Sequence, residues 1–439
     1  MDTSKPSILV ISSVTYASGV LGVNYYDALK DEGYDVDFLT RDYHPDRPEF
    51  IHVLNKGERA HCLMEGIRRR TERFLFPKHK LRFSKNGYCF FYRKETHPPV
   101  DSYKVIKKIS RKYDLVIVFF WQELLSYQTI KEIDKKLGGV SWIFIAPDYS
   151  PITGGCHFMY NCKGYQNECG SCPAWKSNNP NDFTHYNWKY RNQVLNNLNV
   201  TLCSNSFVVD NFFSKSSLFK NRRIEKTTMI IDENKFYPKD KIAIRKKLHL
   251  PVDKFVVLFG SQNINDSKKG MNYLFKALMV WYKSLTKEQQ KKILIVSVGS
   301  SDQKIKDKIP FDYSEWGYVD LKTLSDLYVA ANVFACPSVF DPGPMMVNQA
   351  ISCGTPVVAF NNGTILDVKN YGNAGYVAIL ENAEDFAHGL NTIFCMTKEE
   401  QKQLSLECRD IAMRMTSRKS CVKSIMAIYS KMNSIPQNT

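Results

Sequence analysis

Short apolar runs alternate with amphipathic segments along almost the whole chain. Near its start, Ser7 to Ser12 forms an apolar run, and Leu21 to Asp31 places apolar side chains at helical spacing. After a turn at Gly33, residues 34–39 alternate between polar and apolar side chains as a strand does. A strand, a helix and a strand in this order are typical of the first unit of a doubly wound parallel sheet.

The same alternation continues to about residue 204 and begins again near residue 255. Short apolar runs and turns separate the segments that have helical spacing. These runs predict strands over 115–120, 141–145, 200–204, 255–260, 292–298, 313–319, 333–335 and 375–377. The segment from about Lys398 to Lys431 keeps its helical periodicity throughout, so we expect one long final helical segment.

This repetition predicts two domains, because 439 residues exceed the size of one ordinary core. We expect an N-terminal domain over 1–228, a C-terminal domain over 229–415 and a last helix, 416–439, that returns to the N-terminal domain. The fold class is therefore α/β, with two doubly wound Rossmann-like parallel-sheet domains facing a central cleft. Ligands of such sheets bind outside the carboxyl ends of the strands.

Composition narrows the class of protein. A hydrophobic content of 44% with 24% charged residues is typical of a globular protein, and no apolar run approaches the length of a membrane span. The first residues lack the pattern of a secretory signal, so we expect a cytoplasmic protein. The formal net charge of +16 favours anionic partners such as nucleotide phosphates, anionic lipids or nucleic acid, without choosing among them.

The stretch Phe340 to Phe360 has the pattern of a ligand-binding turn. It follows a predicted strand and leads into a helix whose first N–H groups, at Met345 and Met346, suit a pyrophosphate or a sugar hydroxyl. Asp341 would lie at the mouth of this site, and Gln349 would follow two helical turns later. The alternative interpretation is an Asp that caps the helix and a Gln that faces solvent.

Asp341, Gln349 and the following Gly-Thr-Pro-Val-Val run resemble the E-x7-E region of retaining GT-B glycosyltransferases of family 4. In that family the first acidic residue lies by the donor sugar and the second binds the ribose hydroxyls of the nucleotide. Here Asp341 keeps the charge on a shorter arm, and Gln349 offers a neutral amide. The resemblance implies the GT-B fold and a nucleotide-diphosphate sugar as co-substrate.

Other landmarks of the family follow in order over nearly the whole chain. Lys269 stands where the family has the lysine that holds the donor phosphates, and Lys268 is expected to supply the charge of an arginine that Ser261 replaces. Without that context, a Lys-Lys pair on a loop is more often a solvated surface. The resemblance assigns the donor site to Gly19, Ser261, Lys268, Lys269, Gly343, Met345, Met346, Gln349 and Asp367.

The mechanism implied is front-face transfer with retention, which needs no protein nucleophile and no catalytic metal. Lys269 and helix N–H groups would stabilise the leaving diphosphate, and Asp341 and Asp148 complete the candidate catalytic residues. Two alternatives come from other classes. A catalytically impaired binding protein is motivated by the altered carboxylate positions, and a basic nucleic-acid-binding protein by the charge, although no RNA-binding motif supports it and we expect no nucleic acid.

Four of the twelve cysteines fall within residues 151–173, a predicted Cys-rich insertion of the N-terminal domain. Cys156, Cys162, Cys169 and Cys172 have the spacing C-x5-C-x6-C-x2-C. This pattern is typical of a closed structural zinc site, and it also suits an iron–sulfur cluster or two redox-labile thiol pairs. Four thiolates would leave no open position, so a catalytic metal is not expected.

The same insertion resembles a subgroup of family 4 that acts in bacterial exopolysaccharide and O-antigen assembly. Asp148, from a His-Asp pair whose first position is Pro147 here, and His157 remain candidates on the acceptor side, together with Trp121. A capping Asp and a structural His are the simpler alternatives. The resemblance implies a saccharide or lipid-linked oligosaccharide acceptor.

Residues 67–94 interleave cationic and aromatic side chains. In a family that glycosylates lipid-linked acceptors, such a segment predicts contact with an anionic membrane surface, and hence a peripheral protein at the inner face of the cell membrane. A solvated helix and loop over an ordinary core explains the pattern equally well. Stacking of single-stranded nucleic acid is the third interpretation.

Overall fold

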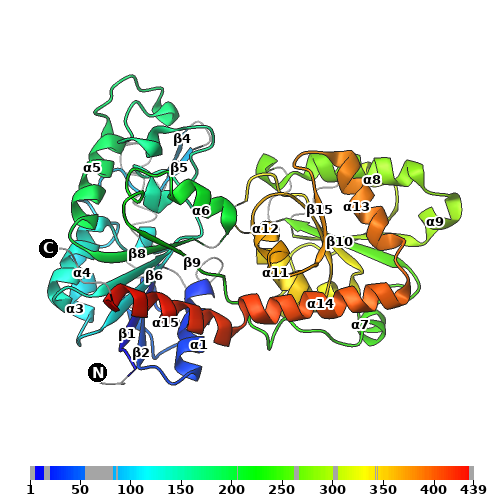
Figure 1. Cartoon of the computed structure of the whole chain (residues 1–439), viewed down its shortest axis with the longest axis horizontal. Coiled ribbons are helices and arrows are strands. Elements are labelled where there is room, and N and C mark those ends of the chain that lie inside the picture. Colours follow the sequence, from blue (N-terminus) through cyan, green and yellow to red (C-terminus); the bar gives the residue numbers. More distant parts are fainter. Residues whose placement is uncertain are drawn as a thin grey trace. The chain divides into compact units, whose positions relative to one another are not determined.

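The computed structural model describes residues 5–13, 20–54, 83–85, 88–204, 206–261, 266–299, 305–341, 343 and 345–434. The chain divides into two compact units (Figure 1). Unit 1 comprises Met1–Asn205, Val209–Thr227 and Val422–Thr439, and unit 2 comprises Ser206–Val208 and Thr228–Cys421. Among the described helices, none combines the length and the apolar character that crossing a membrane requires.

A seven-stranded parallel sheet forms the centre of unit 1, in the order β3-β2-β1-β6-β7-β8-β9. Its strands are β1 (Ile8–Ser12), β2 (Val36–Thr40), β3 (Ile51–His52), β6 (Leu115–Phe119), β7 (Ser141–Ile145), β8 (Asn199–Ser204) and β9 (Arg223–Lys226). The helices are α1 (Val20–Asp31), α3 (Ser102–Lys108), α4 (Tyr127–Leu137), α5 (Phe183–Leu195), α6 (Phe207–Phe213) and α15 (Arg418–Ser434), whose last part belongs to this unit. A short antiparallel hairpin, β4 (Phe83–Lys85) and β5 (Tyr88–Phe90), lies beside the sheet.

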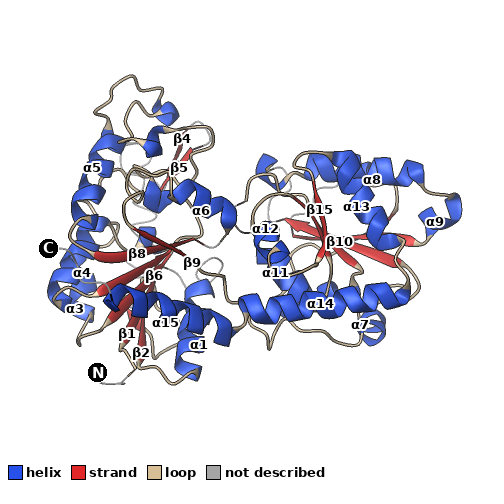
Figure 2. Ribbon diagram, viewed as in Figure 1, coloured by secondary structure: helices blue, strands red, loops and turns tan. Residues whose placement is uncertain are grey.

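Unit 2 repeats the design with six parallel strands in the order β12-β11-β10-β13-β14-β15. These are β10 (Phe255–Ser261), β11 (Ile293–Gly299), β12 (Asp312–Glu315), β13 (Val333–Cys336), β14 (Val357–Phe360) and β15 (Gly375–Ala378). The helices are α7 (Lys241–Lys247), α8 (Met271–Ser284), α9 (Lys287–Lys291), α10 (Leu321–Ala330), α11 (Met345–Ser352), α12 (Thr364–Lys369), α13 (Ala383–Phe394) and α14 (Lys398–Thr416). Figure 2 shows helices on both sides of this sheet.

The burial of the strands explains their apolar sequences. Every residue of β1, β6 and β7 is buried, because helices cover both faces of a parallel sheet. Right-handed crossovers in the two directions from β1 place α1 on one face and α4 and α5 on the other.

In each unit the strand order reverses once. The reversal lies between β1 and β6 in unit 1 and between β10 and β13 in unit 2. The loops that leave the carboxyl ends of these neighbouring strands run in opposite directions, and the crevice between them is the usual ligand site of such a sheet. In unit 2, the ligand site is therefore expected at the segments after β10 and β13.

Two predicted elements differ from the structure. The strand expected over 313–319 is the shorter β12, and the long final segment is two helices separated by Ser417. The backbone of Ser417 is extended, with φ −64° and ψ 153°, and its hydroxyl accepts a bond of 3.3 Å from the N–H of Ser420. Ser417 thus begins a new helix as an N-cap, a role that periodicity alone does not reveal.

Candidate functional site

Lys269 and Asp341 meet at the reversal of the strand order in unit 2. Lys269 ends a short 3-10 turn that follows β10, and Asp341 lies in the segment between β13 and α11. The Nζ atom of Lys269 stands 2.5 Å from Oδ2 of Asp341. The sequence predicted both residues as charged members of a donor site. The structure places their side chains in contact, although they are 72 residues apart in the chain.

Backbone contacts hold these two loops against each other. The carbonyl oxygen of Lys268 accepts bonds from the N–H groups of Val339 and Phe340 at 2.9 and 3.2 Å. Asp266 caps the 3-10 turn by accepting from the N–H of Lys268 at 3.0 Å. The main chain that carries Lys269 is thus held against the segment that carries Asp341.

Gly270 allows this close approach. Its φ of +64° is left-handed, and a Cβ atom there would lie 1.9 Å from the carbonyl oxygen of Pro337. We expect Gly270→Ala to lower the free energy of unfolding by more than the roughly 1–2 kcal/mol that a left-handed L-residue costs. Gly317→Ala is the matched control, because Gly317 has φ +59° but nothing within 4 Å of its Cβ position. Equal losses for the two variants in urea unfolding would contradict the role given to the Pro337 contact.

Charge at the pair favours an anionic or hydroxyl-bearing ligand. The side chain of Lys269 is 35% exposed and that of Asp341 is 13% exposed, so the lysine is the more accessible member of the pair. Burial alone would lower the pKa of Lys269, but the carboxylate of Asp341 outweighs it and holds the pKa above its usual value. A charged lysine is therefore available to phosphate oxygens, and Asp341 also accepts from the N–H of Gly343 at 3.2 Å.

Helix α11 begins at Met345, where the sequence placed its N-terminus. Gln349, on the same helix, is only 8% exposed, so it does not face solvent. Its Oε1 atom accepts a bond of 3.2 Å from the hydroxyl of Tyr328. The preceding residue, Asn348, is buried, and its Oδ1 atom has no hydrogen-bond partner. Sequence reasoning missed Asn348, whose only signal is a polar side chain between the apolar Val347 and the nominated Gln349.

The remaining donor candidates either belong to unit 2 or lie outside the described residues. Ser261 is the buried last residue of β10, and Asp367 is buried in α12. Lys268 has its Nζ atom 3.6 Å from Oδ2 of Asp266. Gly19 lies outside the described residues, so its part in the donor site stays a prediction.

In unit 1, Asp148 and His157 form a pair after the carboxyl end of β7. The Nδ1 atom of His157 stands 3.0 Å from Oδ2 of Asp148, which is almost fully buried. Burial alone would raise the pKa of Asp148, but the imidazole of His157 and the N–H of Ser150 outweigh it and hold the pKa below its usual range. The two atoms lie within ion-pair distance, but their geometry is not that of a hydrogen bond.

Trp121 lies just after the carboxyl end of the neighbouring strand, β6. Its side chain is buried against Phe144, and its indole N–H has no acceptor. The next residue, Gln122, donates to the hydroxyl of Ser150 at 2.5 Å, which links this segment to the one that carries Asp148. Trp121 is thus on the expected edge of the sheet, although its ring is covered.

The four cysteines of the insertion line one small cavity in unit 1, together with Tyr88, Phe90 and neighbouring backbone. None of them is in a disulfide. Burial raises the pKa of Cys169 to about 12 and that of Cys172 to about 11, so both are neutral thiols at neutral pH when nothing else is bound. The structure therefore gathers the cysteines that the spacing singled out.

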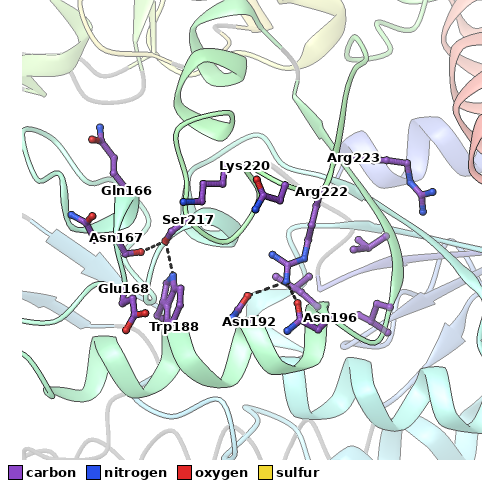
Figure 3. A pocket seen from close by; sticks show the side chains of 14 residues that line it. Gln166, Asn167, Glu168, Trp188, Asn192, Asn196, Ser217, Lys220, Arg222 and Arg223 are labelled. Carbon is purple, nitrogen blue, oxygen red and sulfur yellow. Dashed lines mark hydrogen bonds between the residues drawn. The ribbon is translucent and has the colours of Figure 1, made fainter. Parts of the chain in front are cut away.

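A larger polar pocket of about 770 Å³ lies elsewhere in unit 1 (Figure 3). In it, Arg222 donates to the amide oxygens of Asn192 and Asn196, and the indole N–H of Trp188 donates to the hydroxyl of Ser217 at 2.9 Å. The strand residues of its lining come from the starts of β8 and β9. It therefore lies at the opposite edge of the sheet from Asp148, and sequence reasoning did not anticipate it.

Most of the basic and aromatic segment 67–94 lies outside the described residues. Its last part, from Tyr88, forms β5 and the turn that follows. The predicted contact with a membrane surface consequently stays a prediction.

Part of the sequence is similar to known glycosyltransferases. Residues 254–395, all within unit 2, match the family model described as Glycosyl transferases group 1. An uncharacterized glycosyltransferase of Methanocaldococcus jannaschii is 26% identical over 165 residues, which are 35% of this chain and 39% of that protein. D-inositol 3-phosphate glycosyltransferase of Stackebrandtia nassauensis is 26% identical over 175 residues, which are 37% of this chain and 39% of that protein. The matched regions thus span well under half the length of these curated relatives.

Solved structures resemble the whole chain. A glycosyltransferase from Rickettsia africae has a TM-score of 0.63 at 14% identity, covering 99% of this chain and 100% of that one. Sucrose-phosphate synthase from Thermosynechococcus elongatus has a TM-score of 0.61 at 16% identity, covering 98% and 99%. Anabaena HepE in complex with UDP has a TM-score of 0.60 at 12% identity, covering 98% and 100%. The predicted fold class is confirmed: the chain consists of two Rossmann-like parallel-sheet units of the GT-B type, and the second matches the glycosyl transferases group 1 model.

Proposed function

We propose that this protein is a glycosyltransferase that moves a sugar from a nucleotide-diphosphate sugar to a saccharide acceptor. The observation that carries the proposal is the Lys269–Asp341 pair, held 2.5 Å apart at the strand reversal of unit 2. The pair lies within the residues that match the family model. A cation and a hydroxyl acceptor beside the N-terminus of α11 offer complementary contacts to a diphosphate and to a sugar.

In the proposed reaction, Lys269 and the first N–H groups of α11, at Met345 and Met346, bind the diphosphate and stabilise its charge as the glycosidic bond to it breaks. Asp341 accepts a hydrogen bond from a hydroxyl of the donor sugar. Gln349 contributes through its amide N–H₂ to the ribose, because its oxygen is engaged by Tyr328. The acceptor hydroxyl attacks from the face that the diphosphate leaves, and its proton passes to an oxygen of the departing diphosphate. The anomeric configuration is therefore retained and no protein nucleophile is needed.

On the acceptor side, the proposal assigns Asp148 and His157 to contacts with the incoming hydroxyl. The Nδ1 atom of His157 lies 3.0 Å from Oδ2 of Asp148, and Trp121 follows the neighbouring strand. A saccharide linked to a lipid, an anionic membrane surface and a role in bacterial surface polysaccharide synthesis complete the proposal. These last points rest on the resemblance of the cysteine-containing insertion and on the net charge of +16.

The donor can be identified by thermal unfolding with UDP-, GDP-, TDP- and CMP-sugars. One diphosphate nucleotide should raise the melting temperature, since a ligand at about 100 times its Kd adds about 2.7 kcal/mol to the free energy of unfolding. The shift should vanish in Lys269→Ala. No shift with any nucleotide sugar, together with a shift given by RNA, would instead favour the nucleic-acid-binding alternative.

A turnover measurement distinguishes an enzyme from a protein that only binds the nucleotide sugar. If the chain binds a nucleotide sugar through Lys269 but neither hydrolyses nor transfers it in the presence of saccharide acceptors, the altered residues at positions 341 and 349 have abolished catalysis. Restoring the family residues by Asp341→Glu and Gln349→Glu is then the direct test. Recovery of donor hydrolysis in that double variant would assign the loss to these two side chains.

A further inference from the structure

Four thiols line one small cavity in unit 1. Cys156, Cys162, Cys169 and Cys172 all line a cavity of about 20 Å³. A space of this size holds one water-sized occupant, for which roughly 10–15 Å³ is the minimum. Among the described residues that line it, none carries a carboxylate, imidazole or ammonium group. The polar side chains that an occupant would meet are therefore the thiols and the hydroxyl groups of threonine and tyrosine.

Backbone N–H groups point at two of the sulfur atoms. Gly154 donates to Sγ of Cys169 at 3.2 Å, and Gly164 donates to Sγ of Cys162 at 3.4 Å. Bonds of this kind favour a sulfur that carries negative charge, as a thiolate bound to a metal does. A merely buried thiol behaves as a small apolar group and needs no such donors.

The backbone around the C-x2-C pair is bent into an unusual conformation. Cys169, Gly170 and Ser171 have φ values of 54°, 91° and 44°, which are all left-handed. Two of these three residues are not glycine, and such conformations persist where the surrounding structure demands them. A Cβ atom on Gly170 would lie 2.0 Å from the carbonyl oxygen of Pro180, so this tight turn is enclosed by the chain. The turn brings the sulfurs of Cys169 and Cys172 to the same cavity.

We propose that Cys156, Cys162, Cys169 and Cys172 together bind one structural zinc ion. The set contains only sulfur, and a set of four cysteines is a usual closed tetrahedral zinc site. Within the described part of the chain, no three His, Cys, Asp or Glu side chains are already grouped closely enough to hold an ion. The sulfurs must therefore turn toward the centre of the cavity as zinc enters, which rotation about the Cα–Cβ bonds provides.

The proposed zinc site lies in unit 1, whereas the proposed donor site lies in unit 2. Main-chain contacts connect the zinc site to the Asp148–His157 pair, and the proposed transferase function does not include this connection. Phe90 of the β4–β5 hairpin forms a bridge to Cys156, and the next residue, His157, donates its N–H to the carbonyl oxygen of Cys89 at 2.8 Å. The N–H of Tyr149 donates to the carbonyl oxygen of His157 at 3.3 Å. A metal that fixes Cys156 consequently also fixes His157 beside Asp148.

The test is elemental analysis of the purified full-length chain, prepared in a medium that contains both zinc and iron. We expect one zinc ion per chain in the wild type, and a loss of most of it in Cys162→Ser and in Cys172→Ser. Cys89→Ser and Cys395→Ser are matched controls, because neither cysteine lines the cavity, and both should keep the metal. The metal content is measured independently of donor binding. The zinc proposal can therefore be wrong while the proposed transferase function is right, and the transferase function can be wrong while the zinc proposal is right.

A second measurement covers the case in which the serine variants do not fold. Wild-type protein treated with a strong chelator should release zinc to a colorimetric indicator and unfold at a lower temperature, and cobalt should restore stability with the intense visible absorption of a tetrahedral thiolate complex. Iron with acid-labile sulfide would overturn zinc in favour of a cluster. Disulfides in the mass of the intact protein, or a folded chain that has four free thiols and no metal, would overturn the proposal.

Discussion

Replacement of Lys269 by alanine is expected to reduce donor turnover by about 10²–10³-fold while the protein stays folded. Removal of one group that stabilises charge in the transition state has effects of this size in other enzymes. The lysine is 35% exposed, so its ion pair with Asp341 contributes only about 0–1 kcal/mol to stability, and unfolding is not the expected cause of the loss. Turnover is measured as release of the nucleoside diphosphate from the donor that the thermal panel identifies.

A matched control separates charge loss from a local disturbance. Lys254 also belongs to unit 2 and pairs with Asp312, but it lies before the start of β10, at the opposite edge of the sheet. Lys254→Ala should therefore leave turnover unchanged. Lys269→Arg keeps the charge with a different geometry and should restore part of the activity. If Lys269→Ala lost no more turnover than Lys254→Ala, Lys269 would not be a donor-phosphate ligand.

The pH dependence of the Lys269 contribution follows from the direction of its pKa shift. The folded protein holds the pKa of Lys269 above its usual value. The contribution of the ion pair to the free energy of unfolding is therefore fully present below the unfolded pKa of about 10.4, and it is lost as pH rises through the folded pKa. Any fall in turnover near neutral pH must then come from another group.

Much of the candidate site in unit 2 could be predicted from the sequence because it follows from topology. A strand, a turn with Lys269 and a helix, then a strand, a turn with Asp341 and a helix, were all visible as periodic patterns. Strands β10 and β13 are neighbours in the sheet because the order reverses between them. Once that reversal is assumed, the two turns must meet at one edge, and no knowledge of side-chain packing is needed to bring Lys269 to Asp341.

The environment of single side chains could not be predicted in the same way. Gln349 lies about one turn into α11, and helical spacing left open whether its amide meets a ligand or solvent. Its burial against Tyr328 depends on how α10 packs beside α11, and one helix's periodicity carries no information about its neighbour. Similarly, helical periodicity alone does not reveal the capping bond at Ser417 that separates α14 from α15, near the boundary expected at residue 416.

The buried pair of Glu95 and Arg191 was also beyond the sequence, because 96 residues separate the two and neither lies in a recognisable motif. Their side chains are only 1% and 3% exposed, with Arg191 Nε donating to Glu95 Oε1 at 2.6 Å. Burial alone would lower the pKa of Arg191, but the carboxylate of Glu95 outweighs it, so the pKa is raised and the arginine stays charged. Glu95 also accepts from the N–H of Tyr127 at 2.9 Å, the first residue of α4.

Arg191 in turn ties α5 to the segment that leads into the cysteine cluster. It donates to the carbonyl oxygens of Ser150 and Thr153 at 2.5 and 2.6 Å. Arg191→Met is therefore expected to lower the free energy of unfolding by about 3–5 kcal/mol, because it leaves a buried carboxylate and two carbonyl groups without their partner. Arg47→Met, which removes an ion pair with Asp27 whose two side chains are each 28% exposed, should cost about 0–1 kcal/mol.

Urea unfolding of the two variants gives the comparison, and a double variant gives the cause. If the uncompensated charge of Glu95 is what destabilises Arg191→Met, then adding Glu95→Gln should recover part of the loss, since a neutral amide is less costly to bury unpaired. Failure of the second substitution to recover any stability would assign the loss to the carbonyl groups of Ser150 and Thr153. In that case the same arginine would be acting mainly to hold the chain between Asp148 and Cys156 in place.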